Sequence, residues 1–185
     1  LGDAAVKQPC VGEAGVGKSR LLLEFKRRVG DAPLTWLEGH CLQYGESIIY
    51  KPFLDILRTY LSIDMDDREF VIKKRIRNKV NHLDPKLAYT IPVFQEFMSV
   101  PVDDRDHLKM EPQSKKQRLF EAIRDIFITQ SYKGTLVVAV EDLHWIDRSS
   151  EELIDYLVEW VAKSPILLIL LYRPEYRHQW ANKSY

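Results

Sequence analysis

The sequence Gly12-Glu13-Ala14-Gly15-Val16-Gly17-Lys18-Ser19 fits the pattern G-x-x-x-x-G-K-S/T at every fixed position. It lies between a candidate strand, residues 6–11, and a helix expected over residues 19–29. Glycines at this spacing let the backbone curl so that several N–H groups face one phosphate, and the helix that follows adds the positive end of its dipole. A plain glycine turn before a helix would need neither the Lys-Ser pair nor three glycines at these offsets. The stretch therefore predicts a phosphate-binding loop.

The residue types of this loop have separate expected tasks. The Lys18 amine would reach the β and γ phosphates of a nucleoside triphosphate, and the Ser19 hydroxyl would ligate Mg²⁺. The guanine-selecting pattern N-K-x-D is absent, because residues 78–81 and 182–185 begin with Asn-Lys but end in Asn and Tyr. We therefore expect ATP with Mg²⁺. The residues expected to bind the nucleotide are Gly12, Glu13, Ala14, Gly15, Val16, Gly17, Lys18, Ser19 and Arg20.

An acidic pair, Glu141-Asp142, follows the apolar run of residues 136–140. It would lie at the carboxyl end of a buried parallel strand, where such sheets bind ligands. Both carboxylates are candidate Mg²⁺ ligands together with Ser19. In the usual register Glu141 takes the metal side and Asp142 orients or deprotonates the attacking water, but the sequence leaves the reverse order open.

Arg173 directly follows a second apolar run, residues 166–172. It would emerge at the same edge of the sheet as the loop and the carboxylates, where bidentate contacts could sense or stabilise the γ-phosphate. The alternative is a surface arginine before Pro174. The expected catalytic residues are Lys18, Glu141, Asp142 and Arg173.

Strand and helix patterns alternate along the chain. The late strands are apolar throughout, which is typical of a parallel sheet covered on both faces. We therefore predict an α/β chain with the three-layer fold of a P-loop NTPase, a mostly parallel sheet, and a mostly helical insertion at about residues 52–130, between the second strand and the acidic strand. Besides those named above, the candidate elements are a strand at residues 35–41 and a helix at about 113–130.

Two helices carry more detailed predictions. Leu21, Leu22, Phe25 and Val29 recur at helical spacing after the phosphate loop. Ser149-Ser150-Glu151-Glu152 is a capping box that should begin another helix. The buried stripe of this later helix is expected to consist of Leu153, Leu157 and Trp160.

Composition excludes several classes of protein. The chain has 185 residues, and its 27 Lys+Arg balance 27 Asp+Glu, so no net charge attracts nucleic acid or an anionic membrane. Two cysteines are too few for a secreted disulfide scaffold and favour the cytoplasm. The longest apolar run is far shorter than the roughly 20 residues that a membrane helix needs. No repeat or linker divides the chain, so residues 1–185 are expected to form a single ATPase core.

A basic cluster in the expected insertion has two interpretations. It could bind nucleic acid, or it could be a solvated helix face, and the second is favoured because Asp64, Asp66 and Asp67 adjoin it. Its members are Arg68, Lys73, Lys74, Arg75, Arg77 and Lys79. His144 and Trp145 are expected to pack or to position the turn after the acidic pair. Direct nucleic-acid binding is not expected.

Residues 12–22, together with Glu141-Asp142-Leu143-His144-Trp145-Ile146-Asp147, resemble the signal-transduction ATPases of the AAA/STAND group. The similarity is strongest to the ATPase modules beside class III adenylate/guanylate cyclase domains and in large multidomain transcriptional regulators. Residues 39–46 and 50–53 look like the segment after the second strand of these modules. Residues 172–176 look like the segment after their sensor strand.

This resemblance implies an order of strands and a task. The strand with Arg173 would separate the phosphate-loop strand from the Glu141 strand, and Cys10 and Cys41 would lie on non-adjacent strands. The task would be that of a Mg²⁺-dependent ATP-binding and slowly ATP-hydrolysing switch in a multidomain signalling protein, with a cyclase or DNA-binding output domain and a nucleotide-dependent oligomer as partners. The lid that closes over the nucleotide in this group is expected to be absent from residues 1–185.

Two departures and two alternatives accompany the resemblance. Residues 6–11 are more polar than the usual first strand and contain Pro9, which has no N–H to donate. The segment that grips the base in this group is expected to be absent before them. A nucleotide-dependent scaffold or oligomerisation module without significant hydrolysis, or a DNA-loading ATPase of the origin-recognition type, would share the same loop and sheet.

Overall fold

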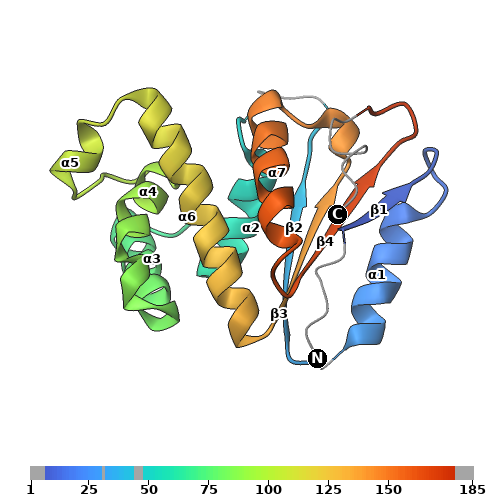
Figure 1. Ribbon diagram of the computed structural model, residues 1–185, viewed down its shortest axis with the longest axis horizontal. Coiled ribbons are helices and arrows are strands. Elements are labelled where there is room, and N and C mark those ends of the chain that lie inside the picture. The colour runs from blue at the N-terminus through green and yellow to red at the C-terminus, as the bar shows by residue number, and fades with distance from the viewer. Residues whose placement is uncertain (1–6, 31, 44–47, 178–185) are drawn as a thin grey trace.

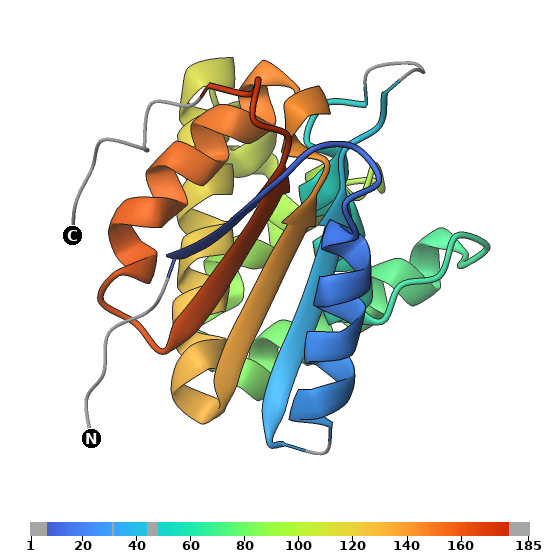
Figure 2. The same cartoon turned by 90° about the vertical axis from the view of Figure 1, so that its right-hand side faces the viewer.

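A parallel sheet forms the centre of the computed structural model, which describes residues 7–30, 32–43 and 48–177. Within these residues the strands are β1 (Lys7–Val11), β2 (Leu34–His40), β3 (Thr135–Glu141) and β4 (Ile166–Tyr172). Their order is β1-β4-β3-β2 and every pairing is parallel (Figure 2). The predicted parallel α/β fold is confirmed. The order implied by the resemblance is confirmed as well, because β4 separates β1 from β3.

Helices cover the two faces of the sheet unequally. α1 (Lys18–Val29) lies on one face, and α6 (Pro112–Lys133) and α7 (Arg148–Val161) lie on the other (Figure 2). α2 (Lys51–Leu61) packs against β2. Four further helical elements of the described chain lie beyond α6, away from the sheet (Figure 1); they are α3 (Glu69–Leu83), η1 (Pro85–Tyr89), α4 (Thr90–Phe97) and α5 (Arg105–Leu108).

The core has two parts because successive strand residues face opposite sides. Leu136, Val138 and Val140 belong to the large cluster that includes the insertion helices and α7. Val137 and Ala139 belong to a small cluster under α1. Of the four apolar α1 residues at helical spacing, only Leu22 is buried.

Pro9 lies inside β1, and the position of this strand explains why proline is tolerated there. Among the strands that the structure describes, β1 is at the edge and pairs with β4 alone. A missing N–H costs less at an edge, where only one side of the strand forms a ladder. Val6, which the sequence placed in this strand, lies outside the described residues.

Two predictions for α7 were wrong. The helix begins at Arg148, and its cap is Asp147, whose carboxylate accepts hydrogen bonds from the Ser150 backbone N–H at 3.0 Å and hydroxyl at 2.5 Å. An aspartate cap is as favourable as a serine cap, so two overlapping cap signals competed. Trp160 is 41% exposed. Its ring packs on the Arg124 guanidinium at 4.4 Å, which gives this side chain a partner outside the core.

No helix in the described part of the chain is both long and apolar enough to cross a membrane.

Gly39 lies at a close approach between the sheet and the insertion. A Cβ atom there would lie 2.3 Å from the Pro52 carbonyl oxygen, which is backbone and cannot move aside. Gly39→Ala should therefore lower the free energy of unfolding by about 1–3 kcal/mol, the usual cost of overpacking. Urea unfolding measures the change. Gly134→Ala is the control, because its Cβ would lie 3.3 Å from the Pro33 oxygen; equal losses in the two variants would contradict the close approach of α2.

Candidate active site

Three glycines shape the loop between β1 and α1. Gly15 and Gly17 have φ angles of 76° and 94°, in the left-handed region that favours glycine. A Cβ on Gly12 would lie 2.7 Å from Cγ1 of Val16. The Gly12 N–H donates to the Tyr172 carbonyl at 3.4 Å, so the loop is attached to the end of β4. The loop geometry accounts for the glycine at each of these offsets.

Lys18, the first residue of α1, turns its amine back onto this loop. Its Nζ donates to the carbonyl oxygens of Gly12 at 2.7 Å and Glu13 at 2.9 Å. Glu13, Ala14 and Val16 are exposed at the loop surface. The predicted binder Arg20 instead forms an ion pair with Glu24 at 2.9 Å along α1.

Ser19 and Glu141 meet across the end of the sheet. The Ser19 hydroxyl donates to Glu141 Oε2 at 2.5 Å, although the two residues belong to α1 and β3. His40 Nε2 lies 3.3 Å from the other carboxylate oxygen. His40 was not predicted as a site residue, and only the register of β2 on β3, which pairs His40 with Glu141, would have indicated it.

Asp142 directs the chain away from the strand. Its backbone is left-handed, with φ 57° and ψ 39°, and it begins the short helix η2 (Leu143–Trp145). Its carbonyl accepts the Trp145 N–H at 2.9 Å. Among the described residues its carboxylate forms no hydrogen bond or ion pair. The structure therefore brings Glu141, and not Asp142, to Ser19.

Arg173 emerges at the same edge of the sheet as expected, but its contact there is an aromatic ring. The guanidinium carbon lies 5.2 Å from the Trp145 ring centroid. The His144 ring lies 4.4 Å from that of Trp145, and both of its nitrogens are buried without a hydrogen-bond partner in the described structure. Burial first, and then the Arg173 charge, lowers the pKa of His144, so its imidazole is neutral at pH 7.

The donor set at this edge fits Mg²⁺. A serine hydroxyl and a carboxylate supply oxygen ligands, and Mg²⁺ typically takes one or two of these together with waters and substrate phosphates. Residues 7–30, 32–43 and 48–177 contain no group of three or more His, Cys, Asp or Glu side chains that could hold another metal ion.

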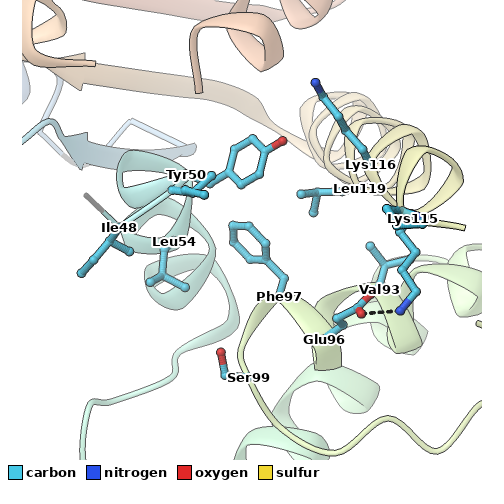
Figure 3. Close-up of a pocket in the computed structure, with 12 residues that line it drawn as sticks. Ile48, Tyr50, Leu54, Val93, Glu96, Phe97, Ser99, Lys115, Lys116 and Leu119 are labelled. Carbon is cyan, nitrogen blue, oxygen red and sulfur yellow. Dashed lines mark hydrogen bonds and ion pairs between the residues drawn. The ribbon is translucent and has the colours of Figure 1, made fainter. Parts of the chain in front are cut away.

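A separate cavity of about 470 Å³ lies in the insertion, between the start of α2, α4 and α6 (Figure 3). The Tyr50 ring faces Phe97 there at 6.0 Å, and Lys115 pairs with Glu96 at its rim. None of the predicted site residues lines this cavity. Tyr50, which lines this cavity, donates its backbone N–H to the Asp147 carboxylate at 3.3 Å.

Several members of the basic cluster are held by ion pairs or by a ring contact. Lys73 pairs with Asp103 at 2.8 Å, and Arg75 pairs with Asp67 at 2.9 Å. Lys79 lies over the Tyr60 ring at 4.6 Å. These contacts favour the solvated-face interpretation over a nucleic-acid patch.

Comparison with known proteins agrees with this geometry. The model of the family described as "AAA ATPase domain" matches residues 9–169. The chain is also similar to an uncharacterized protein of Rhizobium meliloti (strain 1021), at 30% identity over 177 residues. That alignment covers 94% of this chain and 17% of the Rhizobium protein, so the chain spans less than a fifth of the length of its relative.

Cys41 is a buried residue beside the site, where its backbone N–H donates to the Glu141 carbonyl at 3.1 Å. The reactivity of its thiol therefore tests the packing there. Burial, and then the nearby carboxylates Asp147 and Asp142, raises the pKa of the Cys41 thiol to about 12. Since only the thiolate is alkylated quickly, iodoacetamide should modify Cys41 slowly in the folded chain up to about pH 10. Mass spectrometry gives the extent at each cysteine. Urea-unfolded chain is the control, and rapid modification of folded Cys41 at pH 8 would contradict this burial.

Proposed function

This chain belongs to the AAA ATPase domain family, and on that premise we propose that it is a Mg²⁺-dependent, ATP-hydrolysing switch domain of a multidomain signalling protein. The observation that carries the proposal is the hydrogen bond between Ser19 and Glu141. It joins the phosphate loop to the acidic strand, and ATP hydrolysis requires both parts at one place.

Each side chain has a separate role in the in-line attack of water on the γ-phosphate. Lys18 moves from the Gly12 and Glu13 carbonyls to the phosphate oxygens and stabilises their charge. Ser19 and Glu141 would hold Mg²⁺, which would supply positive charge that stabilises the phosphates. The Ser19 contact supports Glu141 as the metal-side carboxylate.

Asp142 then orients the attacking water and accepts its proton. Its carboxylate is free of other partners in the described residues, and its left-handed backbone separates it from the metal-side position. Arg173, on the neighbouring strand, stabilises the charge that develops on the γ-phosphate. Hydrolysis is slow, because a switch depends on a long-lived triphosphate form.

The signalling context rests on the resemblance and on length. The Rhizobium relative is several times longer than the aligned region. We therefore propose that this domain acts with an output domain in the same polypeptide, of the cyclase or DNA-binding class, and that nucleotide controls an oligomer. The DNA-loading alternative is disfavoured, because ion pairs occupy Lys73 and Arg75.

Nucleotide binding is tested by thermal stability. ATP with Mg²⁺ at about 100 times its dissociation constant should stabilise the fold by about 2.7 kcal/mol, a rise in Tm of roughly 5–10 °C. Lys18→Ala should abolish the rise. Lys74→Ala is the matched control, since Lys74 is exposed on α3 and loses the same charge. An equal shift in Lys18→Ala would exclude the site.

Phosphate release tests the roles of the two carboxylates. Asp142→Asn should lower kcat by about 10²-fold or more while ATP affinity is retained, because it removes the water-orienting group. Glu141→Gln should instead raise the Mg²⁺ concentration needed for half-maximal ATP binding. If Glu141→Gln lowers kcat and Asp142→Asn raises the Mg²⁺ requirement, the roles of the two carboxylates are reversed. The scaffold alternative would be selected if the wild-type chain binds ATP but releases phosphate no faster than the Glu141→Ala, Asp142→Ala double variant.

A further inference from the structure

We propose that Trp145 and Tyr176 are positioning residues that fix the Arg173 side chain at the carboxyl edge of the sheet. Trp145 supports the guanidinium, and Tyr176 fixes the backbone turn that follows it. This inference rests on the proposed function, in which Arg173 acts on the γ-phosphate.

The first observation is the kind of partner that Arg173 has. In the described part of the chain its guanidinium forms no ion pair, and it lies 5.2 Å from the Trp145 ring centroid. A carboxylate partner would neutralise the charge and occupy N–H donors. An aromatic face holds a cation by its quadrupole and uses none of the five donors. Arg173 is therefore held in place with its charge and its hydrogen bonds still available to an oxyanion.

The second observation is that the Trp145 ring is itself well supported. Trp145 ends the short helix η2, and its backbone N–H donates to the Asp142 carbonyl at 2.9 Å. Leu143, in the same turn, is fully buried and anchors it in the core. His144 packs against the ring at 4.4 Å between centroids.

The third observation lies on the other side of Arg173. The chain turns directly after this residue, and the Tyr176 N–H donates to the Arg173 carbonyl at 3.1 Å. The Tyr176 hydroxyl donates to Glu151 of α7 at 2.7 Å, and its ring meets that of Tyr172 at 5.5 Å. Trp145 and Glu151 flank the same connection from η2 into α7. The segment after β4 is thus attached twice to the segment after β3.

These contacts predict which measured quantity should change. An arginine side chain loses much rotamer freedom when it binds, and a side chain already held in place loses less. The γ-phosphate is the group that distinguishes ATP from ADP. Removal of the Trp145 ring should therefore weaken ATP binding relative to ADP binding and lower kcat, while the affinity for ADP stays the same.

The test compares Trp145→Leu with Trp160→Leu. Trp160 is a matched control, because Arg124 lies over its ring at 4.4 Å, far from the phosphate loop along α7. Dissociation constants for Mg²⁺-ATP and Mg²⁺-ADP are measured by calorimetry, and kcat by phosphate release. We expect Trp145→Leu to lower the ATP:ADP affinity ratio and kcat on the order of 5-fold. Trp145→Phe should restore most of both, and Trp160→Leu should change neither.

A double-mutant cycle with Arg173→Gln shows whether Trp145 acts through Arg173. The effect of Trp145→Leu on the ATP:ADP affinity ratio should vanish when Arg173 is already replaced. Tyr176→Phe keeps the ring but loses the bond to Glu151, so it should change the ratio in the same direction in a variant expected to fold. An unchanged ratio in both Trp145→Leu and Tyr176→Phe, or equal effects of Trp145→Leu in the two backgrounds, would overturn the positioning roles.

Failure of the proposed function gives a different result. If the wild-type chain neither binds nor hydrolyses ATP, the proposed function fails. If it does both and Arg173→Gln by itself leaves the ratio and kcat unchanged, Arg173 has no task at the γ-phosphate, and its proposed role and the positioning roles fall together. If Arg173→Gln lowers both quantities while the Trp145 and Tyr176 variants match wild type, the proposed function stands and only the positioning roles are excluded.

Discussion

The site depends on one hydrogen bond, from the Ser19 hydroxyl to the Glu141 carboxylate at 2.5 Å. The strands that lead to these residues are not neighbours, because β4 lies between β1 and β3. The contact therefore has to cross the end of β4, and it can do so only where all three strands end at the same level. Parallel pairing provides that condition, since it puts every carboxyl end at one edge. The Gly12 N–H attaches the loop to Tyr172 at the same edge.

Patterns within short stretches were enough to predict much of this structure. The glycines and the Lys18-Ser19 pair identified the loop, and the apolar runs identified β3 and β4. Contacts between distant segments were not accessible in the same way. His40 reaches Glu141 only through the register of β2 on β3, whose residues are about a hundred positions apart in the chain. The sequence did not decide the cap of α7, because Asp147 and Ser149 are equally good cap residues. Asp147 is the cap in the structure, and the choice between them depends on how the chain leaves η2.

The helical insertion is connected to the site through the start of α7. Asp147 caps that helix and accepts the Tyr50 N–H at 3.3 Å, so the entry into α2 and the exit from the acidic turn share one carboxylate. Lys116 of α6 forms an ion pair with Glu152 one turn later. Tyr50 has a left-handed backbone, which a non-glycine residue adopts only when its surroundings hold it there. The insertion and the end of the acidic turn therefore share contacts at the start of α7.

The two hydrogen bonds from Lys18 to its own loop affect which anions can bind. The amine is already satisfied by the carbonyl oxygens of Gly12 and Glu13, so a ligand must compete for it. A halide or another weakly solvated monovalent ion offers little advantage over two carbonyl dipoles at these distances. A polyphosphate offers several charged oxygens at once, and these can also accept hydrogen bonds from the first turn of α1 and the Ser19 hydroxyl. Under the proposed function, the loop therefore selects its ligand by charge density before the base of the nucleotide makes any contact.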